Sequence, residues 1–210
     1  MGQTIGLNGA EASSALSSIE EQYSGIMQEI NALQGSALEK IKASWIGEDA
    51  TDFANNKFIP AIKDAGNEIQ KVFQSVNDTI TQNAQNYERK HNVNVFKKVS
   101  HIPRPVNLTP IPRPTGDFIG IKDISGLTET SNGLRKMAQK IGEYLARAKQ
   151  AASRSGFYGE NQQEKLTASM GKIQKSLEDL AKQLEDAVKK KMQTVEEEEK
   201  SIAQQNASTM

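Results

Sequence analysis

The chain has 210 residues, of which 36% are apolar and only 5% aromatic, and it carries no cysteine and a formal net charge of zero. Without cysteine, a disulfide framework and a thiolate metal site are both excluded. The balanced charge argues against a nucleic-acid-binding protein, and no stretch approaches the roughly 18 apolar residues of a membrane span. So little apolar material favours long amphipathic helices that each bury one narrow stripe.

The first part of the chain predicts a long helix whose apolar residues follow one another at steps of three and four. These residues are Leu16, Ile19, Tyr23, Ile26, Ile30, Leu33, Ala37 and Ile41. The pattern stops after Ser44, where Gly47 suits a turn. Glu48 and Asp49 suit the positive N-terminal end of a new helix, so we expect a helical hairpin that turns near Trp45.

The second helix of this hairpin carries a stripe of its own. Its members are Phe53, Phe58, Ile62, Ile69, Val72, Val76, Ile80 and Tyr87. Pro60 lies well inside the pattern, and proline removes a backbone donor and clashes with the preceding turn. We therefore predict a kink near residues 56–60 and not a helix end, because the stripe resumes on the same face.

Residues 91–122 have a different character and predict a linker. Ile102-Pro103-Arg104-Pro105 recurs as Ile111-Pro112-Arg113-Pro114, and five prolines within twelve residues favour extended, polyproline-like chain. The segment carries five Lys/Arg against one Asp/Glu, whereas residues 1–90 carry seven against twelve. A stiff basic spacer is the default interpretation, and a docking motif for a proline-reading domain is the alternative.

Residues 123–210 predict a second hairpin. The first stripe comprises Leu127, Leu134, Met137, Ile141, Leu145, Ala148 and Ala152. After a break at residues 153–159, the second comprises Leu166, Met170, Ile173, Leu177, Leu180, Leu184, Val188, Met192 and Val195, close to a coiled-coil seam. Carboxylate pairs such as Glu178-Asp179 and Glu185-Asp186, with lysines at matching offsets, are interpreted as a charged flank.

The two halves align without a gap at an offset of 112 residues, which indicates a diverged internal repeat. Trp45 falls on Phe157 and Gly47 on Gly159. The stripes align as well, through the pairs Leu33–Leu145, Phe58–Met170, Val72–Leu184, Val76–Val188 and Ile80–Met192. The predicted fold is therefore all-α, with two tandem hairpins, residues 1–90 and 123–210, packed as an antiparallel four-helix bundle that mimics a dimer.

A long helix, the turn Trp45-Ile46-Gly47 and a second long helix together resemble the WXG family, the ESAT-like helical hairpins of type VII secretion in Gram-positive bacteria. The turn Phe157-Tyr158-Gly159 matches that pattern loosely, with an aromatic residue in place of tryptophan and Lys165 where Phe53 would fall. The resemblance covers residues 10–90 well and residues 125–202 loosely.

The resemblance implies a secreted or co-secreted interaction partner that works with the secretion machinery and with another WXG-type protein or a larger effector. The family's export signal is a Tyr-x-x-x-Asp/Glu pattern after the second helix. Tyr87 stands in that region, but His91 occupies the acidic position, so Tyr87 is at most a remnant of the signal. This departure keeps a retained cytosolic chaperone or targeting factor open as an alternative.

No phosphate loop, nucleophile elbow or zinc helix is present in the sequence, so we expect no catalytic, cofactor-binding or metal-binding residue. The N-terminus lacks the cationic start and apolar run of a signal peptide. We expect synthesis in the cytoplasm, export only by a route without a cleaved leader, and a monomer with intramolecular hairpin pairing. A coiled-coil scaffold unconnected with secretion is the third interpretation.

Overall fold

The computed structural model describes residues 8–94, 96, 110–112 and 120–208. These residues are almost entirely helical, which confirms the predicted all-α class. In chain order the elements are α1 (Gly9–Ser44), β1 (Trp45–Ile46), α2 (Glu48–Phe53), a π-helical turn (Ala54–Phe58), α3 (Ile59–His91), β2 (Gly120–Ile121), α4 (Ile124–Arg154) and α5 (Glu160–Ser208). In the described part of the chain, no helix combines the length and the hydropathy needed to cross a bilayer.

Helix α1 begins and ends where its local chemistry predicts. The Asn8 side chain caps its start by accepting a hydrogen bond from the backbone N–H of Ala10 at 2.9 Å. The predicted stripe of α1 is buried, apart from Leu33, which packs partly exposed against the core. The helix stops because Trp45 takes extended backbone angles, with φ −132° and ψ 120°.

The helical run from Glu48 to His91 contains the interruption that Pro60 predicts, in the form of a π-helical turn over Ala54–Phe58. The N–H of Ile59 donates to the carbonyl of Ala54, five residues back, in place of the usual four. Pro60, which has no N–H to donate, follows at the start of α3. Beyond it the stripe of α3 continues on the buried side as far as Ile80, and Tyr87 is half-buried.

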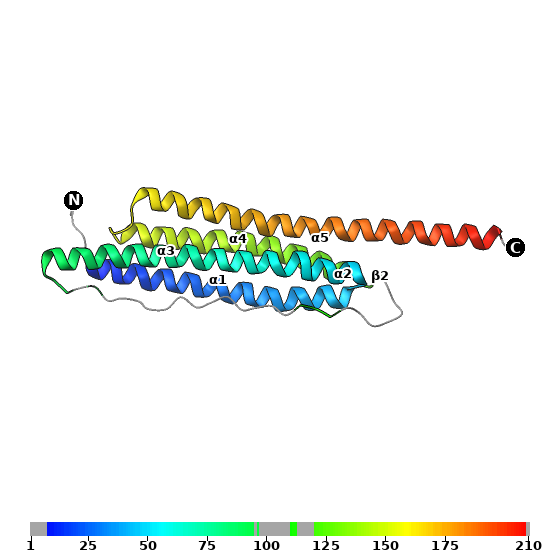
Figure 1. Cartoon of the computed structure of the whole chain (residues 1–210), viewed down its shortest axis with the longest axis horizontal. Coiled ribbons are helices and arrows are strands. Elements are labelled where there is room, and N and C mark those ends of the chain that lie inside the picture. The colour runs from blue at the N-terminus through cyan, green and yellow to red at the C-terminus, as the bar shows by residue number, and fades with distance from the viewer. Residues whose placement is uncertain (1–7, 95, 97–109, 113–119, 209–210) are drawn as a thin grey trace.

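Helices α4 and α5 bury the stripes predicted for them, with one difference. The α4 residues are all buried, and so is the α5 stripe through Val188 except for the partly exposed Met170. From Met192 onward, α5 leaves the core: 36% of Met192 is exposed, and so is 57% of Ile202. Figure 1 shows the reason, since α5 runs well past the ends of the other helices.

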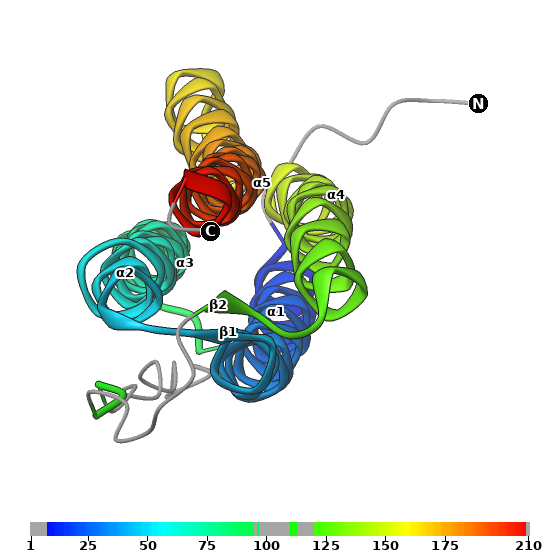
Figure 2. The same cartoon turned by 90° about the vertical axis from the view of Figure 1, so that its right-hand side faces the viewer.

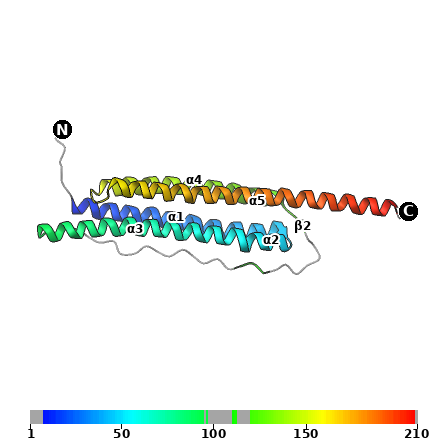
Figure 3. The ribbon, with the colours of Figure 1, turned by 45° about the horizontal axis from the view of Figure 1, so that its top comes forward.

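The four long helices lie along one common axis (Figure 1), and each contacts two others. Helix α1 packs against α3 and α4, and α5 packs against the same two helices on the other side. Figure 2 shows this arrangement end-on, and Figure 3 shows that α1 with α3 and α4 with α5 form two adjacent layers. Among the described residues, the chain reverses direction at Trp45 and at residues 155–159. The predicted division into residues 1–90, 91–122 and 123–210 stays a prediction, because α4 packs against α1 as well as against α5.

Helices α1 and α4 run in opposite directions, as their cross-helix contacts show. Glu29 of α1 accepts a hydrogen bond from Lys140 of α4 at 2.7 Å, and Lys40, further along α1, pairs with Glu129, which lies earlier in α4. A Cβ placed on Gly25 would come within 2.6 Å of the Tyr144 ring of α4. Glycine at position 25 therefore allows this close approach between the two helices.

Helices α4 and α5 are joined by a charged hydrogen-bond group. Arg135 of α4 donates to both carboxylate oxygens of Glu185 in α5, and the Ser131 hydroxyl donates to the same carboxylate at 2.6 Å. These bonds hold the pKa of Glu185 at about 2, below its usual value. The interpretation of Glu185 as part of a charged flank is incomplete, because this carboxylate reaches across to α4.

A short two-stranded pairing ties the beginning of the second half of the chain to the end of α1. Strand β1 pairs with β2 in antiparallel fashion, with Trp45 opposite Ile121 and Ile46 opposite Gly120. The N–H of Lys122 donates to the carbonyl of Ser44 at 2.7 Å, which extends the pairing by one bond. In Figure 2 the two strands lie side by side across this end of the molecule, where α4 begins. We call this pairing the clasp.

Candidate functional site

The first turn, predicted from Trp45 and Gly47, is a rigid corner between α1 and α2. Gly47 adopts φ 145° and ψ 174°, a conformation that L side chains rarely take, so glycine is required there. Thr51, one turn into α2, donates through both its N–H and its hydroxyl to the carbonyl of Gly47, each at 3.2 Å. The corner is thus fixed by glycine, by these bonds and by the clasp.

Trp45 is the side chain that closes this corner. Only 3% of it is exposed, and its ring lies against Phe53 with the ring centroids 5.8 Å apart. The indole therefore packs in the corner between α1 and α2. The indole N–H of Trp45 is buried and donates to no acceptor among the described residues, which is costly inside a protein.

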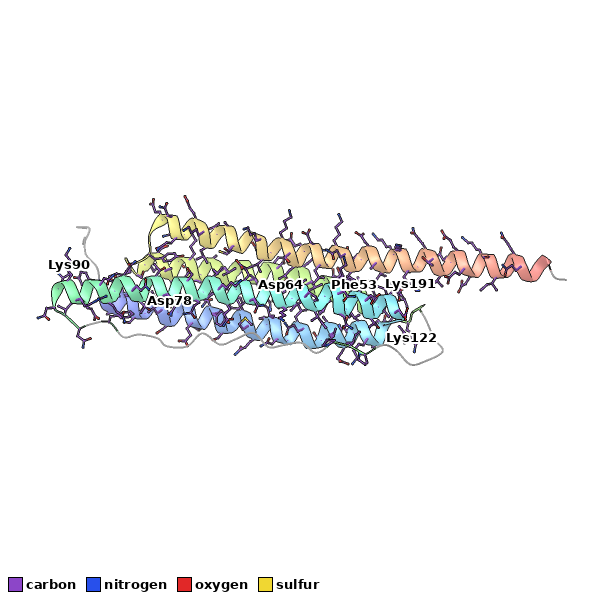
Figure 4. The ribbon with its side chains drawn as sticks, viewed as in Figure 1. Phe53, Asp64, Asp78, Lys90, Lys122 and Lys191 are labelled. Carbon is purple, nitrogen blue, oxygen red and sulfur yellow. The ribbon has the colours of Figure 1, made fainter. Side chains whose placement is uncertain are left out.

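A cavity of about 500 Å³ lies beside Trp45, between α2 and the far part of α5. Its lining residues are Trp45, Asp49, Asp52, Phe53, Asn56, Lys57, Ala187, Lys190, Lys191 and Thr194. Lys191 spans the gap with an ion pair to Asp49 at 3.2 Å. Figure 4 shows Phe53, Lys191 and Lys122 at this end of the bundle of helices. Lys90 lies at the opposite end.

The second turn, predicted from Phe157 and Gly159, is built differently. The glycine with a positive φ is Gly156, at 69°, and not Gly159, so the aligned glycines of the two turns do different work. Gly159 instead donates its N–H to the side chain of Gln162 at 2.9 Å, near the start of α5. Phe157 is buried like Trp45, but the described residues place no strand beside it.

The structure brings Tyr87 and Phe157 together, although sequence alignment gave no reason to link them. Their rings meet edge to face with centroids 5.9 Å apart. The ring centroids of Tyr87 and His91 are 4.4 Å apart. Asn83, one turn before Tyr87, donates its side-chain amide to the carbonyl of Phe157 at 2.7 Å. The end of α3 therefore caps the second turn, just as α5 covers the first.

A contact that the sequence did not predict fastens part of the proline-marked segment to the π-helical turn. The Asn55 amide donates to the carbonyl of Ile111, and the N–H of Ile111 donates back to Asn55, each at 2.9 Å. The Ile111 side chain is buried in the core cluster. The sequence contained part of the evidence for this contact, because an apolar residue between two prolines suits an extended segment that packs against the helices. Most of the predicted linker lies outside the described residues.

The second turn contains a buried titratable residue, Tyr158. Burial raises the pKa of Tyr158, beside Phe157, to about 12, so its phenol stays protonated and donates to the carbonyl of Gln162 at 2.9 Å. In the described part of the chain, no group of three or more His, Asp and Glu side chains is placed to hold a metal ion. Each turn therefore contains a buried aromatic residue, Trp45 or Phe157, with a cavity beside it.

No protein-family model matches the chain, and neither a curated protein nor a solved structure matches it at a significant level.

Replacing Trp45 with alanine should strongly destabilise the protein, because the indole fills the corner between α1 and α2. We expect a loss of about 3–5 kcal/mol in the free energy of unfolding, as for other large core aromatics. Trp45→Phe keeps an aromatic ring against Phe53 and should lose less. Thermal melts of the three proteins measure this, and a Trp45→Ala melt within about a degree of the wild type would contradict the packing role.

Replacing Asn55 with alanine should release Ile111 from the π-helical turn, because both hydrogen bonds to its backbone are lost. Hydrogen exchange at the Ile111 amide should then speed up about tenfold or more, given the usual net worth of such bonds. The matched control is Asn56→Ala, since Asn56 is exposed and adjacent. Equal acceleration in both variants would show that Asn55 does not hold this segment.

Proposed function

We propose that this chain is a non-enzymatic helical interaction protein of type VII secretion, similar to the WXG family and exported with, or as, a partner of a secreted protein. The observation that carries the proposal is the first turn. Trp45 is buried at the joint of two long helices, and Gly47 two residues later has backbone angles that demand glycine. A Trp-x-Gly motif with these roles at the tip of a helical hairpin is what the resemblance implies.

We further propose that the four long helices form an antiparallel four-helix bundle, in which one chain provides both halves of a dimer-like pair. Three observations support this. Helices α1 and α4 run in opposite directions, each turn is covered by the second helix of the other half, and the clasp starts α4 beside the end of α1. In this arrangement Trp45 and Phe157 lie at opposite ends of the bundle.

The second candidate, a cytosolic chaperone or targeting factor for a larger effector, is favoured by the surroundings of Tyr87. His91 stands four residues after Tyr87 where an acid would complete the family's export pattern. Tyr87 is half-buried and occupied by its contacts with Phe157 and His91, so less of its ring is accessible to a receptor. A chain that lacks its own signal could still bind and deliver a partner that has one.

Fractionation of cultures into cells and medium tests the proposal. The chain should appear in the medium of bacteria with an active type VII system and stay in the cells when that system is inactivated. A cytoplasmic marker protein in the same fractions controls for lysis.

The other outcomes are equally informative. A chain that stays in the cells and co-purifies with a larger secreted protein would support the chaperone. A chain found in the medium regardless of the secretion system, or in cells with no secreted partner, would contradict both and favour the scaffold.

A further inference from the structure

Exposed apolar side chains gather at one end of the molecule. In the described part of the chain, four large apolar residues are markedly exposed: Val93, Ile124, Met192 and Ile202. Ile124 begins α4 beside the clasp, and Met192 and Ile202 lie on the far part of α5, which projects from the same end (Figure 1). Only Val93 lies elsewhere, just after α3 ends. Three of the four therefore belong to elements at the end of the molecule where α5 projects.

The projecting part of α5 continues the apolar seam past the ends of the other described helices (Figure 1). Met192, Val195 and Ile202 follow Val188 at steps that keep them along one side of the helix. The side chains of residues 196–205 are all exposed. The stretch from residue 195 to residue 208 spans about 21 Å at 1.5 Å per residue, enough for four turns of a second helix.

The charge of this projecting part indicates which kind of helix fits. Glu196, Glu197, Glu198 and Glu199 are exposed on it, with Lys200 as its only cation. Two copies of this chain placed seam to seam would bring together two such carboxylate runs, which repel each other. A helix with lysine or arginine beside its apolar face would instead meet opposite charges.

The cavity beside Trp45, where the projecting part begins, is lined by three lysines, Lys57, Lys190 and Lys191, together with Asp49 and Asp52. Among the described residues, neither Lys57 nor Lys190 forms an ion pair with a carboxylate. The carboxylate of Asp49 is already paired with Lys191. The last turn of a helix suits these two ammonium groups, because its carbonyls lack hydrogen-bond partners and the helix dipole is negative at that end.

We propose that this end of the molecule binds one basic amphipathic helix of a partner protein. The helix lies antiparallel to α5, with its apolar face on Met192, Val195 and Ile202 and its C-terminal turn in the cavity beside Trp45. The proposal rests on the proposed function and specifies the chemistry of the partner.

The single tryptophan of the chain makes the test direct, because Trp45 gives the only indole signal. The probe is an 18-residue helical peptide without tryptophan, with leucines along one face, lysine and arginine on the flanks and an amidated C-terminus. The control is the same peptide with glutamate in place of every lysine and arginine. Added to the full-length protein, the basic peptide should shift the indole N–H resonance saturably, and the acidic peptide should leave it in place.

Variants locate the site, with affinity read from the anisotropy of a dye-labelled basic peptide. Ile202→Glu should weaken binding about tenfold, although it adds a negative charge that would strengthen non-specific attraction. Val93→Glu, the same type of change at an exposed apolar residue away from this end, is the matched control and should bind like wild type.

Three results would overturn the proposal: equal binding of the acidic peptide, unchanged affinity of Ile202→Glu, or sedimentation showing that the chain pairs with its own copy through this end. Each is independent of the culture fractionation. A protein exported by the type VII system that fails these binding tests would retain its proposed function and lose only this site.

Discussion

The clasp between β1 and β2 is the constraint on which the rest of the arrangement depends. A helical hairpin returns its chain to the end at which it started, so α3 ends near the start of α1. The pairing of Trp45 with Ile121, and the bond from Lys122 to Ser44, nevertheless place the start of α4 beside the end of α1. The end of α3 and the start of β2 therefore lie at opposite ends of the helices, and the proline-marked sequence between them is long enough to span that distance.

The position of the start of α4 determines the direction of α4 and the position of the second turn. With α4 running back along α1, Phe157 comes to the end where α3 finishes, and Tyr87 and Asn83 are there to cover it. Helix α5 then returns to the first turn and supplies Lys191 to Asp49. Because α5 has 49 residues and α4 only 31, it overshoots, which creates the exposed seam from Met192 to Ile202.

The two turns, which the sequence alignment predicts to be equivalent, are built differently. Both aromatic residues, Trp45 and Phe157, are buried at a helix–helix corner. In the first corner Gly47 has the positive φ, and the clasp adds hydrogen bonds. In the second corner Gly156 has the positive φ, and Asn83 of α3 donates a hydrogen bond. Alignment by residue type equates Gly47 with Gly159, but the glycine with a positive φ in the second turn is Gly156.

Much of the helical pattern could be predicted, because a stripe at steps of three and four has a single physical explanation over such lengths. The buried faces from Leu16 to Ile41 and from Leu127 to Ala152 agree with that pattern. Contacts between distant residues could not be predicted in this way. The bonds of Asn55 to Ile111 and the pairing of Arg135 with Glu185 depend on which faces meet in three dimensions, and single side chains of these types are common on any helix. The cavity beside Trp45 likewise arises only when α5 lies against α2.

The separation between the two turns tests the central claim most directly. The chain has no cysteine, so spin labels can be attached selectively at Ala43→Cys and Glu160→Cys, exposed positions beside Trp45 and Phe157. If the clasp sets the direction of α4, the labels should lie about 45–55 Å apart, the length of α4 or somewhat more at 1.5 Å per residue. A distance below about 20 Å, two helix diameters, would place both turns at one end and contradict the account.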